Sequence, residues 1–357
     1  MRTKKILLIL TGGTVCSFAN EQGEQASDTK KAQALIVDHF RKGNSRYSSE
    51  DCVRFTSVSP LNVLSENMTV AHWDVLIGAL RTYDYSQYDG VILLHGTDTL
   101  AYTASLLSLL LAGLPIPVLL VSSQLPLSNP QANGNRNFQA AVELIANGIQ
   151  PNVYAVYENE EITRGTPSRV MYVHFGAHLL QCANRSNNFY SCDMTAVDTQ
   201  NASFKGIAAK KATPLLFDDR LKALNARILK IQPYVGLDYS TLSIDGIDAV
   251  IHGTYHSSTV ATDTDLPTKD GRCSSVLHFA ARCRNHTPPI PLFLEPYEKT
   301  TYETTGDALR NGILPIENLT SETAYVKALV GCSLGLSQEE LYDFINSDVN
   351  RERLPPC

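Results

Sequence analysis

Short apolar runs alternate with helical patterns from residue 5 onward, and this alternation is the feature that most constrains the fold. Four of the runs are apolar on both faces, which is typical of strands buried inside a parallel sheet. They span residues 5–10, 91–94, 118–121 and 153–157. Amphipathic or fully apolar helical patterns lie between them, over residues 67–83, 98–112 and 135–147. Strand and helix in this order predict an α/β domain whose parallel sheet is covered by helices on both faces.

The alternation fades and then resumes, which indicates a second domain. Residues 164–213 show little periodicity, and residues 214–225 are typical of a linker. A second set of strands is predicted at residues 227–231, 248–251 and 291–294, and helices at 274–284 and 337–345. A chain of 357 residues is long enough for about two domains. We predict a larger N-terminal α/β domain over residues 1–213 and a smaller C-terminal α/β domain over residues 226–357.

Composition excludes several classes of protein. The chain is 43% hydrophobic and 18% charged, which excludes a disordered chain. Its net charge of −6, without a basic stripe, argues against nucleic-acid binding. The longest apolar stretch, residues 106–121, is interrupted by Gly113, Pro115 and Pro117, and so is too short to span a membrane. The basic start and short apolar run at the N-terminus lead directly into a glycine loop, which favours an opening strand over a signal peptide. These features predict a cytoplasmic protein.

The eight cysteines and nine histidines are dispersed along the chain. None of the cysteines forms a C-x-x-C pair, and no cysteine–histidine spacing matches a zinc site. We therefore predict reduced thiols and no metal ion.

Two glycine loops rich in hydroxyl groups directly follow predicted strands. They are Thr11-Gly12-Gly13-Thr14 and Gly96-Thr97-Asp98-Thr99. The carboxyl ends of parallel strands share one edge of the sheet, so both loops are expected at the edge where α/β sites form. From spacing alone, turns and helix N-caps explain these residues equally well.

The chemistry of two threonines and an aspartate favours one reaction class. A threonine hydroxyl becomes a nucleophile when a base or a positive charge favours its alkoxide. Backbone N–H groups of a glycine loop can hold the oxyanion that forms on an attacked acyl carbon. A nearby carboxylate attracts a substrate ammonium, so the set suits hydrolysis of a small amide that carries an amino group. The competing phosphate loops, G-x-x-x-x-G-K-[ST] and G-x-G-x-x-G, are absent.

Four segments of the chain carry a family likeness: LTGGTV at residues 10–15, LSENMT at 64–69 followed by Trp73, YDGVILLHGTDTLAYTA at 88–104, and PVLLVSSQLP at 117–126. On these segments the chain resembles the bacterial L-asparaginases, specifically their cytoplasmic type I branch. The likeness is strong over residues 5–165 and looser from residue 226 to the end. The resemblance implies hydrolysis of L-asparagine to L-aspartate and ammonia through an acyl-enzyme intermediate, without a cofactor.

The resemblance also implies roles for individual residues. Thr14 would be the nucleophile and Thr97 the second catalytic threonine. Asp98 would bind the substrate α-ammonium and Ser65 its α-carboxylate. Glu66 falls where the family often has a glutamine or serine that helps to hold the ammonium. The implied substrate-binding set is Gly13, Ser65, Glu66, Gly96, Thr97 and Asp98. The alternative role for Ser65 and Glu66 is a helix cap before Asn67.

Two departures from the family affect proton handling. Arg169 occupies the position of the family's catalytic lysine, and no lysine occurs between Lys42 and Lys205. Arginine keeps the positive charge but cannot readily give up a proton. In the mobile lid after Thr14, Glu24 stands where some type I relatives have a tyrosine whose hydroxyl assists the nucleophile. A general base is one role for Glu24, and a solvated loop carboxylate is the alternative.

The remaining expectations concern assembly and competing functions. His256 and Glu303 match segments that, in the family, approach a neighbouring subunit's site, and the family forms homodimers, often paired into homotetramers. Surface or interface roles are the alternative for both residues. A weakened relative that senses asparagine or aspartate is a second hypothesis, favoured by Arg169 and by the missing lid tyrosine. A different substrate, such as glutamine, a D-amino-acid amide or a modified asparagine, is a third. An ammonia supplier for a tRNA-dependent amidotransferase is disfavoured, since the chain opens at its first strand.

Overall fold

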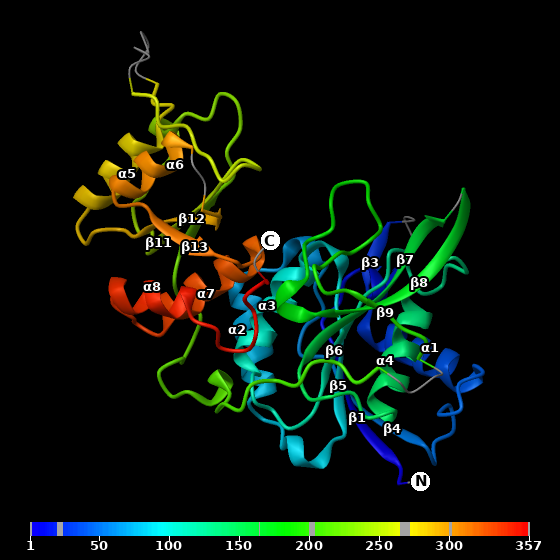
Figure 1. Ribbon diagram of the computed structural model, residues 1–357. Coiled ribbons are helices and arrows are strands. Elements are labelled where there is room, and N and C mark those ends of the chain that lie inside the picture. The colour runs from blue at the N-terminus through cyan, green and yellow to red at the C-terminus, as the bar shows by residue number, and fades with distance from the viewer. Residues whose placement is uncertain are drawn as a thin grey trace. The chain divides into compact units, whose positions relative to one another are not determined.

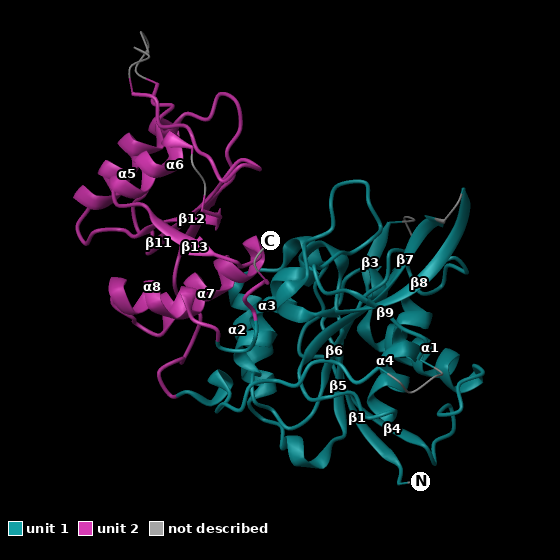
Figure 2. Ribbon diagram, viewed as in Figure 1, with its two compact units in different colours: residues 1–218, 349–351 teal, residues 219–348, 352–357 magenta. Residues whose placement is uncertain are grey.

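The computed structural model describes residues 2–19, 24–163, 165–199, 204–264, 272–299 and 302–355. The chain divides into two compact units, coloured teal and magenta in Figure 2. The first comprises residues 1–218 and 349–351, and the second residues 219–348 and 352–357. The division after residue 218 falls within the predicted linker. Residues 349–351 return to the first unit, which the predicted boundaries did not include.

The first unit is built on a seven-stranded sheet in the order β4-β1-β5-β6-β7-β8-β9. The strands are β4 (Val53–Val58), β1 (Lys4–Leu10), β5 (Gly90–Leu94), β6 (Val118–Val121), β7 (Val153–Thr163), β8 (Thr166–Phe175) and β9 (Thr195–Ala196). The first five are parallel, which confirms the predicted α/β class. β8 and β9 extend the sheet antiparallel, in the stretch where no element was predicted. The outer half of β8 is solvent-exposed, so its sequence lacks the apolar run that marks a buried strand.

Helices cover both faces of this sheet (Figure 1). Because side chains alternate along a strand, Ile6 and Leu8 of β1 share one face, where they pack in one core with Ile36 of α1 and Phe138 of α4. The other face is covered by α2 and α3. The helices are α1 (Thr29–Lys42), α2 (Val70–Leu80), α3 (Leu100–Leu110) and α4 (Gly134–Ala146). Two short strands, β2 (Ser17–Ala19) and β3 (Gln25–Ser27), pair antiparallel. The first unit also contains the 3₁₀ helices η3 (Tyr85–Gln87) and η6 (Leu215–Phe217).

The helix starts follow local capping chemistry. The Asp28 side chain accepts the N–H of Lys31 at the start of α1. Thr69 and His72 form a reciprocal capping box, so α2 begins at Val70 rather than at the predicted residue 67. The predicted helix from residue 98 begins at Leu100, because Thr97–Thr99 form the short 3₁₀ helix η4.

The second unit is a four-stranded parallel sheet in the order β10-β11-β12-β13. Its strands are β10 (Ile228–Ile231), β11 (Ala249–Gly253), β12 (Leu292–Tyr297) and β13 (Leu314–Glu317). One face packs against α5 (Val276–Asn285) and α6 (Glu303–Arg310), and the other against α7 (Ser321–Ser333) and α8 (Gln338–Asn346). The 3₁₀ helix η7 (Tyr239–Thr241) adds Tyr239 to the first of these cores. The second α/β unit was predicted; β13, α6 and α7 were not.

Two further observations concern the cysteines and the possibility of a membrane-spanning helix. The seven cysteines within the described residues form no disulfide. None of the helices in that part of the chain combines the length and the apolar character needed to cross a bilayer.

Candidate functional site

The two glycine loops touch through their backbones. β1 and β5 pair in parallel with Leu10 opposite Leu94, so the residues that follow both strands meet at one edge of the sheet. A Cβ atom added to Gly13 would lie only 2.2 Å from the Cα of Gly96, and Gly13 has a φ of 81°. No residue with a side chain fits there, since both the space and the backbone conformation require glycine. Thr14 and Thr97 are the residues that follow these two glycines.

Hydrogen bonds hold the first loop in this position. The backbone N–H and the hydroxyl of Thr11 both donate to the carbonyl of Leu94, at 3.1 and 2.9 Å. Gly13 donates its N–H to the carbonyl of Val63 at 2.8 Å, and Val63 donates to the carbonyl of Thr11 at 3.0 Å. Thr14, half-buried, then opens the 3₁₀ helix η1 (Thr14–Cys16). The loop is therefore tied both to the central strand and to the segment that leads to Ser65.

Ser65 and Asp98 form a direct contact. Ser65 is buried in the 3₁₀ helix η2 (Ser65–Asn67), and its hydroxyl donates to Oδ2 of Asp98 at 3.0 Å. The hydroxyl oxygen of Ser65 also accepts the backbone N–H of Asp98 at 3.2 Å. Thr99 donates its hydroxyl to the carbonyl of Ser65 at 3.1 Å. The side chain that caps α2 is Thr69. The hydroxyl of Ser65 therefore does not cap this helix and bonds to Asp98 instead.

A buried histidine contacts the second glycine loop, residues 96–99, through the carbonyl of Gly96. His95 contacts the carbonyl of Gly96 through Nδ1 at 2.8 Å and the hydroxyl of Thr103 through Nε2 at 2.9 Å. The indole N–H of Trp73 donates to the same hydroxyl at 3.0 Å. Burial lowers the pKa of His95 to about 4, although the Gly96 carbonyl and Asp98 act in the opposite direction. The ring is therefore neutral at pH 7, and its Nδ1–H donates to the carbonyl of Gly96.

A cavity of about 490 Å³ lies beside Thr97 and Asp98. Glu66 lines it together with these two residues, and residues 181–187 line it as well. Asp98 and Glu66 are exposed, whereas Thr97 is half-buried. Within the described chain, Thr14 and Arg169 are not among the lining residues. The cavity therefore offers two carboxylates and a threonine hydroxyl to a small polar ligand.

Two side chains at this cavity were not identified from the sequence. Gln181 donates to the carbonyl of Thr97 at 2.8 Å and accepts the N–H of Ala101 at 3.2 Å. Tyr157 is buried, and its ring packs edge-on against Phe189 with centroids 4.8 Å apart. Burial raises the pKa of Tyr157, so its hydroxyl stays protonated. Gln181 carries no sequence signal because its segment lacks periodicity, whereas Tyr157 could have been noticed as the last residue of a predicted strand.

Arg169 lies in an ion-pair network on the β7–β8 hairpin. Its Nη2 atom is 3.0 Å from Oε1 of Gln131 and 3.6 Å from Oε1 of Glu160. Its Nε atom is 3.9 Å from Oε1 of Glu158, which also receives a bidentate contact from Arg136 at 2.6–2.9 Å. Carboxylates and an amide oxygen thus surround the guanidinium, and the catalytic role of Arg169 stays a prediction.

The three remaining candidates lie elsewhere on the chain. Glu24 is exposed directly before β3, and residues 20–23 of the expected lid lie outside the described residues. His256 follows β11 and contacts the hydroxyl of Ser257 at 3.2 Å. Glu303 is the first residue of α6. His256 and Glu303 belong to the second unit, and the proposed roles of all three stay predictions.

Comparison with known proteins identifies the family. A family model described as asparaginase, N-terminal, matches residues 5–210. The L-asparaginase of Thermococcus kodakarensis is 25% identical over 350 residues, covering 98% of both chains. A glutamyl-tRNA(Gln) amidotransferase component from Methanosphaera stadtmanae is 23% identical over 367 residues, covering 98% of this chain and 77% of that protein.

The fold agrees with this match. The solved structure of the thermostable L-asparaginase from Thermococcus kodakarensis superposes with a TM-score of 0.75 at 22% identity, covering 99% of this chain and 100% of that one. The family model also spans more than half of the 357 residues, including both glycine loops. The chain belongs to the asparaginase family.

Proposed function

We propose that this protein hydrolyses L-asparagine to L-aspartate and ammonia, with Thr14 as the nucleophile. The observation that carries the proposal is the backbone contact between Gly13 and Gly96. Thr14 and Thr97 are the next residues in the two loops, and Thr97 lines the cavity together with Asp98. The similarity to a full-length L-asparaginase supports the same reaction.

The substrate binds through its charged α-groups. The carboxylate of Asp98 faces the cavity and attracts the α-ammonium, with Glu66 adding a second negative charge. The hydroxyl of Ser65 holds Asp98 in place by donating its one proton to that carboxylate, and the role at the α-carboxylate that the resemblance implies for Ser65 stays a prediction. This arrangement leaves the side-chain amide of the substrate to reach the threonines.

The reaction then proceeds in two steps. The hydroxyl oxygen of Thr14 attacks the amide carbon and forms an ester, while the carbon–nitrogen bond breaks and the nitrogen leaves as ammonia after taking a proton. Water hydrolyses the ester to L-aspartate and restores the hydroxyl. The N–H of Gly13 is donated to Val63 and does not stabilise the oxyanion. We assign that role to N–H groups at the start of η1, which have no partner within a helix.

Ammonia release tests this proposal. Purified protein is incubated with L-asparagine, and ammonia is measured for the wild type, Thr14→Ala and Thr97→Val. Loss of the nucleophile should lower kcat at least about 10³-fold. Thr56→Ala, which removes an exposed threonine hydroxyl on β4, should retain full activity. Full activity in Thr14→Ala would overturn the assignment of the nucleophile.

A second candidate function is binding of asparagine or aspartate without turnover. It is favoured by the position of Arg169, whose guanidinium is engaged by Gln131 and Glu160. Titration calorimetry with L-asparagine and L-aspartate separates the two, because a sensor binds both ligands and releases no ammonia.

The substrate class needs its own arm of the assay. Some relatives are named as components of a glutamyl-tRNA(Gln) amidotransferase, so L-glutamine is tested in parallel with L-asparagine. A kcat/KM for glutamine equal to or above that for asparagine would replace asparagine as the proposed substrate.

A further inference from the structure

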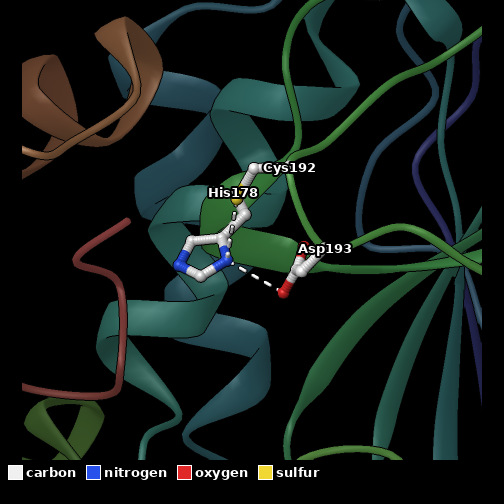
Figure 3. A group of neighbouring side chains, drawn as sticks. All are labelled: His178, Cys192 and Asp193. Atoms are coloured by element: carbon white, nitrogen blue, oxygen red, sulfur yellow. Dashed lines mark hydrogen bonds and ion pairs between the residues drawn. The ribbon is translucent and has the colours of Figure 1, made fainter. Parts of the chain in front are cut away.

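Three side chains with metal-binding atoms converge on one point in the first unit (Figure 3). His178 ends the 3₁₀ helix η5 (Gly176–His178), and Cys192 and Asp193 precede β9. The Nδ1 atom of His178 lies 2.9 Å from Oδ2 of Asp193 and 3.9 Å from Sγ of Cys192. All three potential ligand atoms lie within 4.8 Å of one another.

These separations match a tetrahedral transition-metal site. Zinc bonds of about 2.0 Å to nitrogen and oxygen and about 2.3 Å to sulfur place neighbouring ligand atoms roughly 3.3–3.6 Å apart. The distance from Nδ1 of His178 to Oδ2 of Asp193, 2.9 Å, is shorter than this range, and the distance to Sγ of Cys192, 3.9 Å, is longer. Shifts of a few tenths of an ångström would bring these two distances to the tetrahedral values, and the sulfur and oxygen atoms already lie within 4.8 Å of each other. Imidazole and thiolate ligands favour Zn²⁺ over Mg²⁺ or Ca²⁺, which prefer oxygen.

The packing and the solvent exposure of these side chains suit the binding of a cation. His178 is buried, and its ring packs edge-on against Phe175 with centroids 4.8 Å apart, which fixes its orientation. Cys192 is exposed, so an ion reaches the group from solvent.

The ligands lie at the two ends of a loop that lines the candidate active site. Residues 179–191 connect His178 to Cys192, and the loop closes on itself where Leu180 donates its N–H to the carbonyl of Tyr190 at 3.0 Å. Residues 181–187 of this loop line the cavity beside Thr97 and Asp98. A cation held by both ends of the loop would restrict its motion and so order one wall of that cavity.

In contrast to the expectation from sequence spacing that no metal ion is bound, we propose that His178, Cys192 and Asp193 bind one divalent transition-metal ion of the Zn²⁺ type, which fastens the base of loop 179–191. The three protein ligands leave a fourth coordination position for water. The effect on the cavity rests on the function proposed above, whereas cation binding itself does not.

Titration of the full chain with metal alone tests the site. After treatment with a chelator, the wild type should bind one Zn²⁺ ion by calorimetry. Co²⁺ should give the absorption of a tetrahedral site together with a thiolate-to-cobalt charge-transfer band. His178→Ala and Cys192→Ser should each weaken binding by more than the roughly 10–100-fold that loss of an outer-shell partner costs. The charge-transfer band should vanish in Cys192→Ser.

A second cysteine–histidine contact supplies the matched control. Sγ of Cys273 lies 3.6 Å from Nδ1 of His278, and no third ligand completes this pair among the residues that the structure describes. Cys273→Ser should therefore leave both the affinity and the cobalt spectrum unchanged. Equal binding by the wild type and Cys192→Ser, or an equal loss in Cys273→Ser, would overturn the proposal.

Limited proteolysis reports on the loop without reference to catalysis. Arg185 is exposed in the middle of the loop, where trypsin can cleave after it. Zn²⁺ should slow this cleavage in the wild type and not in Cys192→Ser. Since Cys192 is exposed, its substitution should leave the fold intact even if His178→Ala unfolds the protein. An inert enzyme that still shows protection by Zn²⁺ would overturn the proposed function and support the metal site.

Discussion

The hydroxyl of Ser65 is bound twice by one residue: it donates to the carboxylate of Asp98 at 3.0 Å and accepts that residue's backbone N–H at 3.2 Å. The two side chains come from different loops, and Ser65 is buried while Asp98 is exposed. One serine thus positions both the backbone and the side chain of the aspartate at the cavity.

Replacement of Ser65 by alanine should therefore weaken substrate binding. A hydrogen bond to a charged group contributes about 1.5–3 kcal/mol, so kcat/KM for L-asparagine should fall roughly 10- to 150-fold, mainly through a higher KM. Steady-state kinetics of Ser65→Ala, Asp98→Asn and the double variant measure the coupling. Additive effects of the two substitutions would contradict a shared role.

Gly96→Ala should destabilise the protein and lower its activity. Gly96 has an ordinary φ of −75°, so the effect comes from space alone. A Cβ atom there would lie 2.3 Å from the hydroxyl oxygen of Ser65, and overpacking of this kind costs about 1–3 kcal/mol. The control is Gly78→Ala in α2, where nothing lies within 4 Å and the helix should gain up to about 1 kcal/mol. Urea unfolding measures both, and equal stability of the two variants would refute the steric argument.

The stability of the fold should decrease in mild acid. Burial lowers the pKa of His95, His174 and His252 to about 4 in the folded protein, against about 6.5 in the unfolded chain. Between these pH values the unfolded chain binds more protons than the folded protein does. The contribution of the neutral rings to the free energy of unfolding is therefore complete above pH 6.5 and is lost as the pH falls toward 4. Each histidine adds a slope of up to about 1.4 kcal/mol per pH unit.

Urea unfolding at several pH values checks this expectation. His95→Gln should show a shallower decline with acid than the wild type. An unfolding free energy that does not change between about pH 7 and pH 4.5 would contradict the burial of neutral rings.

Substitution of Arg169 distinguishes a catalytic charge from a structural one. If its positive charge favours the threonine alkoxide, Arg169→Lys should retain most of the activity and Arg169→Met should lose about 10- to 100-fold in kcat. The control is Arg136→Met, which removes another cation from the same carboxylate, Glu158. Equal activity losses in Arg136→Met and Arg169→Met would limit Arg169 to the ion-pair network. Arg169 is partly exposed and lies 3.9 Å from Glu158, so its loss should change stability by only about 0–1 kcal/mol, whereas loss of the bidentate Arg136 contact to the buried Glu158 should cost more.

Much of the fold could be predicted from the sequence because local patterns encode burial. The strand at residues 5–10 is apolar on both faces, and its observed bounds, Lys4–Leu10, agree closely. The threonine and glycine loops at residues 11–14 and 96–99 were located for the same reason, since each directly follows such a strand. The antiparallel strand β8 escaped prediction because its exposed half has no apolar run.

The sequence by itself determined the buried parallel strands with continuous apolar runs, most of the helices that cover them and the two glycine loops, since periodicity and motif are properties of neighbouring residues. Only the tertiary structure decided which side chains meet. It joined Ser65 to Asp98, turned Arg169 toward Glu160 and Gln131, and brought His178 to Cys192 and Asp193. The contact of Arg169 with Glu160 lies within one hairpin, whereas the other contacts link residues that are well separated along the chain. Their geometry depends on sheet order and loop packing, which no local pattern encodes.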